Sequence, residues 1–248
     1  MHKILIIGGT SESYRLAEDL SGTFTPILSL QGNTARPRIG NYSSRVGGFG
    51  GIEGLKDYLL GESINAIVDA SHPYSRQISK NVSIAARDLN VMLYQVHRPT
   101  WKKNPSDFWI EVSSFEEAGL IANNLPKNSR IFLTIGKKNL EIFLGCEKWM
   151  MIRTIDRYRR FISEGKKYIT GRGPFSVSSE LLNMKNNNIT HLITRNSGSV
   201  ETYAKIHACR ILNIPVIMVS RDYNDILGKK QSLQNIRVEL LTHFGLNK

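Results

Sequence analysis

The sequence predicts an α/β protein of two Rossmann-like domains, each with a mainly parallel sheet, and an interdomain cleft. Apolar runs of four to seven residues recur between longer amphipathic stretches, which is typical of βαβ units. This rhythm is interrupted once, from His97 to Pro105, by a segment with two prolines and no periodicity. We therefore expect one domain over residues 1–98 and a second over residues 99–248.

In the first domain, short apolar runs predict strands and the amphipathic stretches between them predict helices. The expected strands are Lys3–Ile7, Pro26–Leu30, Ala66–Asp69 and Val91–Val96. The expected helices lie near Ser11–Leu20, Glu53–Leu60 and Arg76–Leu89. The glycine-rich segment Arg45–Gly51 is expected to be unpaired, and its glycines would let the backbone approach a ligand closely.

The same rhythm returns in the second domain. The expected strands are Phe108–Val112, Arg130–Ile135, Met150–Arg153, Lys167–Thr170, Thr190–Thr194 and Val216–Val219. The expected helices are Ser114–Asn123, Ser176–Lys185, Val200–Leu212 and a final amphipathic segment, Ser232–Phe244. In parallel sheets of this kind, ligands bind beyond the carboxyl ends of the strands, so the loops there matter most.

The composition favours an anionic partner. The 248 residues include 33 Lys and Arg against 21 Asp and Glu, a net charge of +12 that is spread rather than clustered. Cys146 and Cys209 do not form a disulfide framework, and the six histidines show no metal-ligand spacing. No apolar run is long enough to cross a membrane, and we expect no signal peptide before Lys3. We expect a soluble cytoplasmic protein without a metal.

The first loop, Gly8-Gly9-Thr10-Ser11-Glu12, lies between a predicted strand and a predicted helix, where backbone N–H groups attract phosphate. It lacks one glycine of the G-x-G-x-x-G fingerprint, so an ordinary turn capped by Thr10 or Ser11 fits as well. The acidic residue that holds the ribose of NAD, about 20 residues further on, is missing. Arg36 and Arg38 follow instead, and they favour the 2′-phosphate of NADP.

Three further loops carry candidate binding groups. Ser71 and His72 follow a predicted strand, where they are candidates to contact a cofactor or to begin the next helix. In the second domain, the segments Gly171–Phe175 and Arg195–Ser199 each join backbone N–H groups to a cationic side chain before a helix, which suits an anion. Lys205, in the second of these helices, is expected to face the same cleft.

Taken together, seven segments resemble the ordered motifs of the precorrin-6A reductase family. They are GGTSES, GGFGG, DASHPYS, HRPTW, LTIGKKNL, GRGPF and TRNSGSVETYAKIHACRILNIPVIMVSR, and they span Lys3 to about Arg221. The resemblance implies a two-domain enzyme of cobalamin biosynthesis that binds NADPH and a corrin precursor between its domains. It implies hydride transfer to a carbon–carbon double bond of this polycarboxylate tetrapyrrole, which would match the excess of basic residues.

The resemblance assigns most of the site residues in both domains, and Arg153 is added as a cation that would neutralise a substrate carboxylate. For the cofactor they are Gly8, Gly9, Thr10, Ser11, Glu12, Gly47, Gly48, Ser71 and His72, with Arg36 and Arg38 added from the charge argument. For the substrate they are Arg98, Trp101, Arg153, Gly173, Phe175, Arg195, Asn196, Ser197, Gly198 and Lys205. The chain departs from the family where Arg195 replaces a lysine, Ser199 a glycine, and Asp222 a proline.

Several alternatives stay open at this point. The proton donor is His72, Tyr74, solvent or the substrate itself. A reductase or epimerase of a smaller anionic metabolite is a rival, although a lysine follows four residues after none of the tyrosines. A nucleic-acid-binding module is a rival of another class, and we expect no nucleic-acid or membrane partner. The cobalt content of the substrate and the oligomeric state are not predicted.

Overall fold

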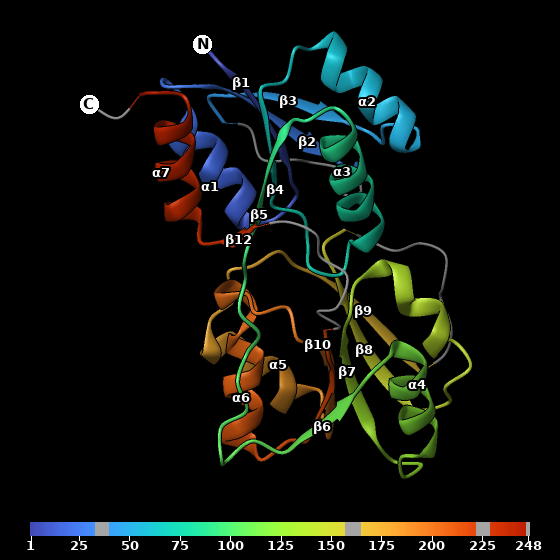
Figure 1. Ribbon diagram of the computed structural model, residues 1–248. Helices are drawn as coiled ribbons and strands as arrows, with labels where there is room; N and C mark the ends of the chain where they lie inside the picture. Colours follow the sequence, from blue (N-terminus) through green and yellow to red (C-terminus); the bar gives the residue numbers. More distant parts are fainter. Residues whose placement is uncertain (33–39, 157–164, 222–228, 247–248) are drawn as a thin grey trace. The chain divides into compact units, whose positions relative to one another are not determined.

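The structure is a computed structural model that describes residues 1–32, 40–156, 165–221 and 229–246 (Figure 1). The chain divides into two compact units. Unit 1 comprises Met1–Arg98 together with Tyr223–Lys248, and unit 2 comprises Pro99–Asp222. Both units are layered α/β structures, so the expected fold class with mainly parallel sheets is confirmed.

The sheet of unit 1 contains, among the described residues, six strands that all run parallel. They are β1 (Lys3–Ile7), β2 (Thr25–Leu30), β3 (Ser43–Val46), β4 (Ala66–Asp69), β5 (Met92–Val96) and β12 (Lys229–Gln231). Their order is β3-β2-β1-β4-β5-β12, which is the strand order of a dinucleotide-binding Rossmann domain with β12 in the sixth place. The order reverses between β1 and β4, and a ligand is expected beyond the carboxyl ends of these strands.

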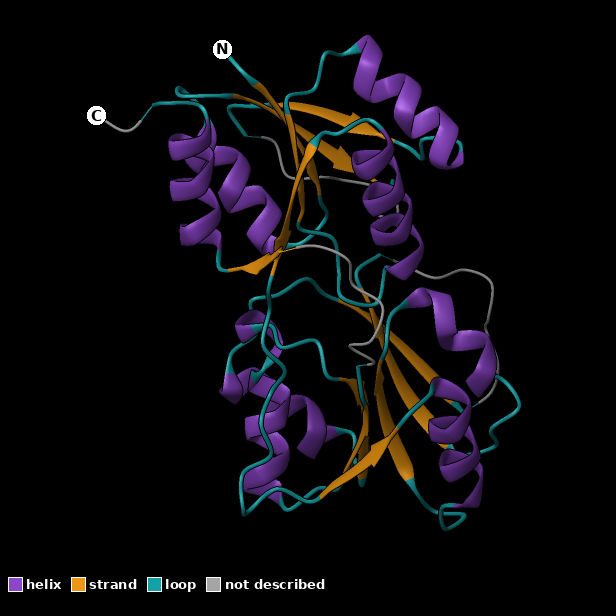
Figure 2. Ribbon diagram, in the orientation of Figure 1, coloured by secondary structure: helices purple, strands orange, loops and turns teal. Residues whose placement is uncertain are grey.

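Helices cover both faces of this sheet (Figure 2). Helix α1 (Ser11–Leu20) packs with α7 (Leu233–His243), and α2 (Gly51–Gly61) packs with α3 (Arg76–Asp88). Because side chains alternate along a strand, β1 contributes to two cores. Ile4 and Ile6 are buried with α1 and α7, whereas Leu5 and Ile7 are buried with α2 and α3.

The sheet of unit 2 has six parallel strands within the part of the chain that the structure describes, in the order β6-β11-β10-β7-β8-β9. They are β6 (Trp109–Val112), β7 (Arg130–Thr134), β8 (Trp149–Thr154), β9 (Lys166–Thr170), β10 (His191–Arg195) and β11 (Val216–Val219). Helices α5 (Val177–Asn186) and α6 (Ala204–Leu212) pack together, and α4 (Phe115–Asn124) packs with the 3₁₀ helix η1 (Lys137–Phe143). Here the order reverses between β7 and β10.

The expected second domain, residues 99–248, is wrong at its C-terminal end. Strand β12 pairs with β5, and α7 buries Ile236 and Leu240 in the core of unit 1. Strand β6 is the first strand of unit 2 in the sequence, and it lies at the edge of that sheet, where it pairs with β11. The amphipathic pattern of Ser232–Phe244 predicts a helix, but it carries no information about which sheet the helix covers.

The other expected strands and helices are confirmed to within about two residues, with two exceptions. Arg45 and Val46, expected to be unpaired, belong to β3 and pair with β2. The helix expected from Val200 begins as a short 3₁₀ turn, Val200–Thr202, before α6 starts at Ala204. Every helix among the described residues is too short or too polar to span a membrane.

Candidate functional site

The turn between β1 and α1 is held by a reciprocal cap. Thr10 is the N-cap residue of α1, and its Oγ1 atom accepts a hydrogen bond from the Ser13 N–H (3.2 Å). The Ser13 hydroxyl in turn accepts from the N–H groups of Gly9 (3.0 Å) and Thr10 (3.2 Å). Gly8 leaves no room for a side chain, because a Cβ there would lie 2.4 Å from Leu28 Cδ1. The expected cap by Thr10 is therefore present.

This turn is joined to the end of β4, across the point where the strand order reverses. Thr10 donates its hydroxyl proton to the carbonyl oxygen of Ala70 at 2.8 Å. The next residue, Ser71, donates its N–H to the carboxylate of Asp69 (3.0 Å). The Nδ1 atom of His72 accepts from the Tyr74 N–H (3.2 Å), so the neutral ring carries its proton on Nε2. The first loop and the Ser71-His72 loop thus form one cluster.

Arg98, expected to bind substrate, forms an ion pair with Glu12, expected to contact the cofactor. Glu12 lies in the first turn of α1, and Arg98 follows β5. The Arg98 side chain is 9% exposed and that of Glu12 is 24% exposed. The guanidinium charge is therefore largely balanced within unit 1, and it fastens the segment after β5 to the first loop.

The glycine-rich loop after β3 provides open backbone. Gly47 and Gly50 have φ angles of 121° and 80°, which disfavour any other residue. A Cβ added at Gly47, Gly48 or Gly50 would meet no atom within 4 Å. The loop is anchored to β2 through the Gly47 N–H, which donates to the Leu30 carbonyl at 2.8 Å.

Arg45, at the start of this loop, was not predicted as a site residue. Its Nη1 atom donates to the Ser29 hydroxyl of β2 (2.8 Å) and to the Gly47 carbonyl (3.1 Å), and its Nη2 atom donates to the Gly48 carbonyl (2.9 Å). Its guanidinium also lies 3.9 Å from the ring centroid of Phe49. A sequence signal was available, because no Asp or Glu occurs between Asp19 and Glu53.

A dinucleotide fits this edge of unit 1. The carboxyl ends of β1, β3 and β4 meet there, since all three strands run parallel in one sheet. Gly9, with a φ angle of 103°, also has no atom within 4 Å of an added Cβ. Open backbone beside the N-terminus of α1 suits a pyrophosphate. Arg36 and Arg38, expected to bind a 2′-phosphate, lie outside the described residues.

In unit 2, the segment after residue 98 is fastened to the loop after β10. The Trp101 N–H donates to Asn196 Oδ1 (2.8 Å), and Asn196 Nδ2 donates back to the Trp101 carbonyl (3.0 Å). The indole N–H of Trp101 donates to the Ser199 carbonyl (3.2 Å). A Cβ at Gly198, where φ is 68°, would lie 1.9 Å from the Pro99 carbonyl oxygen. Of the expected substrate residues, Trp101, Asn196 and Gly198 are thus brought together.

The loop after β9 joins the same cluster. The Phe175 N–H donates to the Glu201 carbonyl at 3.0 Å. A Cβ at Gly173 would lie 3.1 Å from that oxygen, so a side chain there would push the two loops apart. Arg195 comes from the end of β10 and Gly136 from the end of β7, where the strand order reverses. A Cβ on Gly136 would lie 3.6 Å from Arg195 Nη2.

Arg153 and Lys205, expected to bind substrate carboxylates, are buried beneath these loops. Arg153 pairs with Glu180 of α5 at 2.6 Å, and its guanidinium lies 3.9 Å from the centroid of the Phe175 ring. Lys205 is 4% exposed, and its Nζ atom donates to the Thr202 carbonyl at 3.0 Å. Burial, reinforced by the nearby positive charge of Arg153, lowers the pKa of Lys205 to about 7, although Glu180 opposes this shift.

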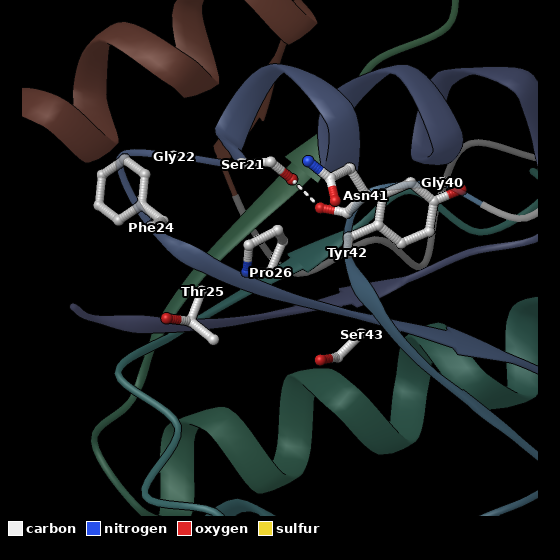
Figure 3. Close-up of a pocket in the computed structure, with 9 residues that line it drawn as sticks. All are labelled: Ser21, Gly22, Phe24, Thr25, Pro26, Gly40, Asn41, Tyr42 and Ser43. Carbon is white, nitrogen blue, oxygen red and sulfur yellow. Dashed lines mark hydrogen bonds between the residues drawn. The ribbon is translucent and has the colours of Figure 1, made fainter.

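A hollow of about 390 Å³ lies at the opposite edge of the unit 1 sheet (Figure 3). Thr25 and Ser43, which line it, are the first residues of β2 and β3. Two of the lining residues are joined by a hydrogen bond, which the Ser21 hydroxyl donates to the Asn41 carbonyl (3.0 Å). No residue predicted from the sequence as a binding residue lines this hollow, so it is separate from the candidate site.

Comparison with known proteins decides between the rival interpretations. The family model described as Precorrin-6x reductase CbiJ/CobK matches residues 3–240. The chain belongs to this family. Membership confirms the resemblance seen in the seven motifs. The family is one of oxidoreductases of cobalamin biosynthesis that act on a carbon–carbon double bond of a precorrin, which implies a nicotinamide cofactor.

Individual members of the precorrin-6x reductase family cover nearly the whole chain. Precorrin-6A reductase of Rhodococcus erythropolis is 36% identical over 224 residues, which are 89% of this chain and 90% of that protein. Cobalt-precorrin-6A reductase of Priestia megaterium is 27% identical over 242 residues, 88% of this chain and 90% of that protein. A solved structure described as CobK precorrin-6A reductase covers 98% of the chain and 97% of its own, with a TM-score of 0.90 and 31% identity.

Proposed function

We propose that the chain is an NADPH-dependent reductase of precorrin-6A, in which unit 1 binds NADPH and unit 2 binds the macrocycle. The observation that carries this proposal is the open glycine backbone at the β1–β4 reversal of unit 1. NADPH rather than NADH is supported by the residues around β2, since the stretch between Asp19 and Glu53 holds several arginines and no carboxylate. The predicted cleft between the units stays a prediction.

When bound, NADPH supplies the hydride. The protein contributes positioning, which can lower the barrier by about 7–11 kcal/mol when reacting groups are well aligned. Gly8 and Gly9 keep side chains away from the first turn, while the Thr10 hydroxyl ties that turn to Ala70. The Glu12–Arg98 pair holds the helix start against the segment after β5. These contacts fix the backbone to which the cofactor binds.

A proton must also reach the reduced macrocycle. His72 and Tyr74 stay the two candidate side-chain donors. They lie next to each other, because the Tyr74 N–H donates to Nδ1 of His72 at 3.2 Å and their ring centroids are 5.8 Å apart.

In unit 2 we assign the substrate carboxylates to Arg195 and to the backbone of the Asn196–Ser199 loop. A precorrin carries several acetate and propionate groups, and the net charge of +12 favours such a ligand. Arg195 is half-buried at the β7–β10 reversal, where a ligand of this fold is expected. Arg153 and Lys205 lie below the loop, and we assign them a supporting role in place of the direct contact expected from the sequence.

The proposal is tested by incubating the purified chain anaerobically with precorrin-6A or cobalt-precorrin-6A and either NADPH or NADH. We expect NADPH to be oxidised in proportion to the macrocycle, whose mass rises by two hydrogen atoms, and NADH to be used far more slowly. A folded chain that oxidises NADPH with neither macrocycle would contradict the proposal. Oxidation with a smaller anionic metabolite instead would support the rival reductase.

Two glycine variants separate cofactor binding from strain. Gly9→Ala and Gly22→Ala both place a methyl group at positive φ, 103° and 90°, with no atom within 4 Å. Both therefore carry a similar backbone penalty of about 1–2 kcal/mol. Gly9 lies at the proposed cofactor edge and Gly22 beside the opposite hollow. We expect only Gly9→Ala to lose NADPH oxidation.

A further inference from the structure

We infer that Arg45 recognises the 2′-phosphate of NADPH and so determines the choice of NADPH over NADH. This inference rests on the proposed function and deepens it, because it names the group that selects the cofactor. The sequence alone suggests Arg36 and Arg38 for this role, and the structure adds Arg45, which lies among the described residues. Four observations carry it.

The first observation is position. Strand β3 pairs with β2 in a parallel register that sets Arg45 opposite Ser29, one residue before the end of β2. In a Rossmann domain the end of this strand faces the adenosine ribose of the dinucleotide. The side chain reaches that strand directly, since Arg45 Nη1 donates to the Ser29 hydroxyl at 2.8 Å. Ser29 is also linked to the first loop, because its carbonyl accepts the Gly8 N–H at 2.9 Å.

The second observation is that the guanidinium is held in place before any ligand arrives. It donates to the carbonyls of Gly47 (3.1 Å) and Gly48 (2.9 Å) as well as to Ser29. Its Cζ atom lies 3.9 Å from the centroid of the Phe49 ring and 5.0 Å from that of the Tyr58 ring. An arginine fixed in this way loses little side-chain entropy on binding a phosphate.

The third observation is the charge of this region. Among the described residues, the contacts of Arg45 are carbonyl and hydroxyl oxygens and aromatic rings, and no carboxylate forms an ion pair with it. These hydrogen bonds use three of the five N–H donors of the guanidinium. A half-buried positive charge with donors to spare attracts an anion, and a phosphate matches the planar fork of arginine.

The fourth observation is the sequence around the strand. NAD-binding domains place an Asp or Glu at the end of β2 to accept hydrogen bonds from the ribose 2′-hydroxyl. Here Gln31 and Gly32 follow β2, and no acidic residue occurs anywhere between Asp19 and Glu53. The adjoining Gly47 and Gly48 leave room above the backbone for a ligand group beside Arg45.

The test measures binding with two probes that differ by one group. Adenosine 2′,5′-bisphosphate carries the 2′-phosphate and adenosine 5′-monophosphate lacks it, and both are titrated calorimetrically into the full chain. For the wild type we expect the bisphosphate to bind at least about 10-fold more tightly. For Arg45→Gln we expect its affinity to fall by about 10- to 100-fold, the range for hydrogen bonds to a charged group, with the monophosphate affinity unchanged. NADPH and NADH should show the same contrast.

The control is Arg15→Gln, which removes the same charge from an exposed position on α1 of the same unit. It should leave the preference for the bisphosphate intact, and thermal melting should show that both variants are folded. If Arg45→Gln weakens both probes equally, Arg45 only holds the glycine loop and the inference is overturned. It is also overturned if Arg45→Gln keeps the preference, or if only the double variant Arg36→Gln/Arg38→Gln loses it.

Failure of this inference is distinguishable from failure of the proposed function. A wild type that prefers NADPH while Arg45→Gln retains the same preference overturns only the role of Arg45. A wild type that binds neither probe and oxidises neither nucleotide overturns the proposed cofactor site as well.

Discussion

At the carboxyl edge of the unit 1 sheet, a methyl group added to Gly9, Gly47 or Gly48 would meet no atom within 4 Å. At the corresponding edge of the unit 2 sheet, a methyl group on Gly173 would lie 3.1 Å from the Glu201 carbonyl oxygen, and one on Gly198 would lie 1.9 Å from that of Pro99. Glycines in equivalent places therefore serve different purposes. In unit 1 they leave room for a ligand, whereas in unit 2 they let one loop pack against another.

The two units also differ in how the charged side chains near these edges are buried and paired. In unit 1, Arg45 is half-buried beside open backbone and has no acidic partner among the described residues. In unit 2, Arg153, Glu180 and Lys205 are buried together beneath the loops. We infer that unit 1 binds its ligand through exposed backbone groups. The binding loops of unit 2 instead pack on a buried cluster of charged side chains.

The largest effect is expected from Gly198→Ala. Positive φ costs about 1–2 kcal/mol for alanine, and the contact with the Pro99 carbonyl forces a backbone shift worth about 1–3 kcal/mol more. Denaturant unfolding should therefore show a loss of roughly 2–5 kcal/mol. The matched variant Gly48→Ala, whose methyl group meets no neighbour, should lose less than about 0.5 kcal/mol. Equal losses would break the distinction between the two edges.

A smaller effect is expected from the titration of Lys205. Its pKa is lowered to about 7 in the folded chain by burial and by Arg153, whereas an unfolded lysine has a pKa of about 10.4. Between these values the unfolded state holds a proton that the folded state lacks. The free energy of unfolding should therefore rise with pH, by at most about 1.4 kcal/mol per pH unit, until about pH 10. Below about pH 7 the full penalty of the buried charge remains.

Lys205→Met keeps the length of the side chain and removes the titrating group. The difference in unfolding free energy between wild type and Lys205→Met, measured with urea from about pH 6 to about pH 10, should rise with pH. The other ionisable groups near Lys205, which include Glu180, Arg195 and Cys209, are present in both proteins and cancel in that difference. A difference that does not vary with pH would show that burial does not lower the pKa of Lys205 in the folded chain.

Much of the fold was predictable because most strands are short apolar runs and most helices are amphipathic. Strand β3 was missed since its sequence, Ser43-Ser44-Arg45-Val46, has one apolar residue, and β12 was missed since Lys229-Lys230-Gln231 has none. Both are edge strands, where polar residues are tolerated. The return of the chain to unit 1 depends on pairing between distant segments, which no local pattern records.

The burial of the unit 2 charges could have been predicted from periodicity. Lys205 shares a helix face with Ala208, Cys209 and Leu212, and all three are apolar. By the same spacing, Glu180 shares a face with Met184, and Arg153 alternates with Met151 along β8. Arg153 and Lys205 are expected from the sequence to contact the substrate because their positive charge would neutralise its carboxylates. The pairing that satisfies them, Arg153 with Glu180, requires the three-dimensional structure.

A crossed binding experiment shows whether unit 1 binds the nucleotide and unit 2 binds the macrocycle. The affinities of NADPH and of precorrin-6A are measured separately for Gly48→Val, which fills the open edge of unit 1, and for Arg195→Gln, which removes a cation from the edge of unit 2. We expect Gly48→Val to weaken the binding of NADPH alone and Arg195→Gln to weaken the binding of precorrin-6A alone. Loss of the opposite ligand in either variant, or equal loss of both, would contradict it.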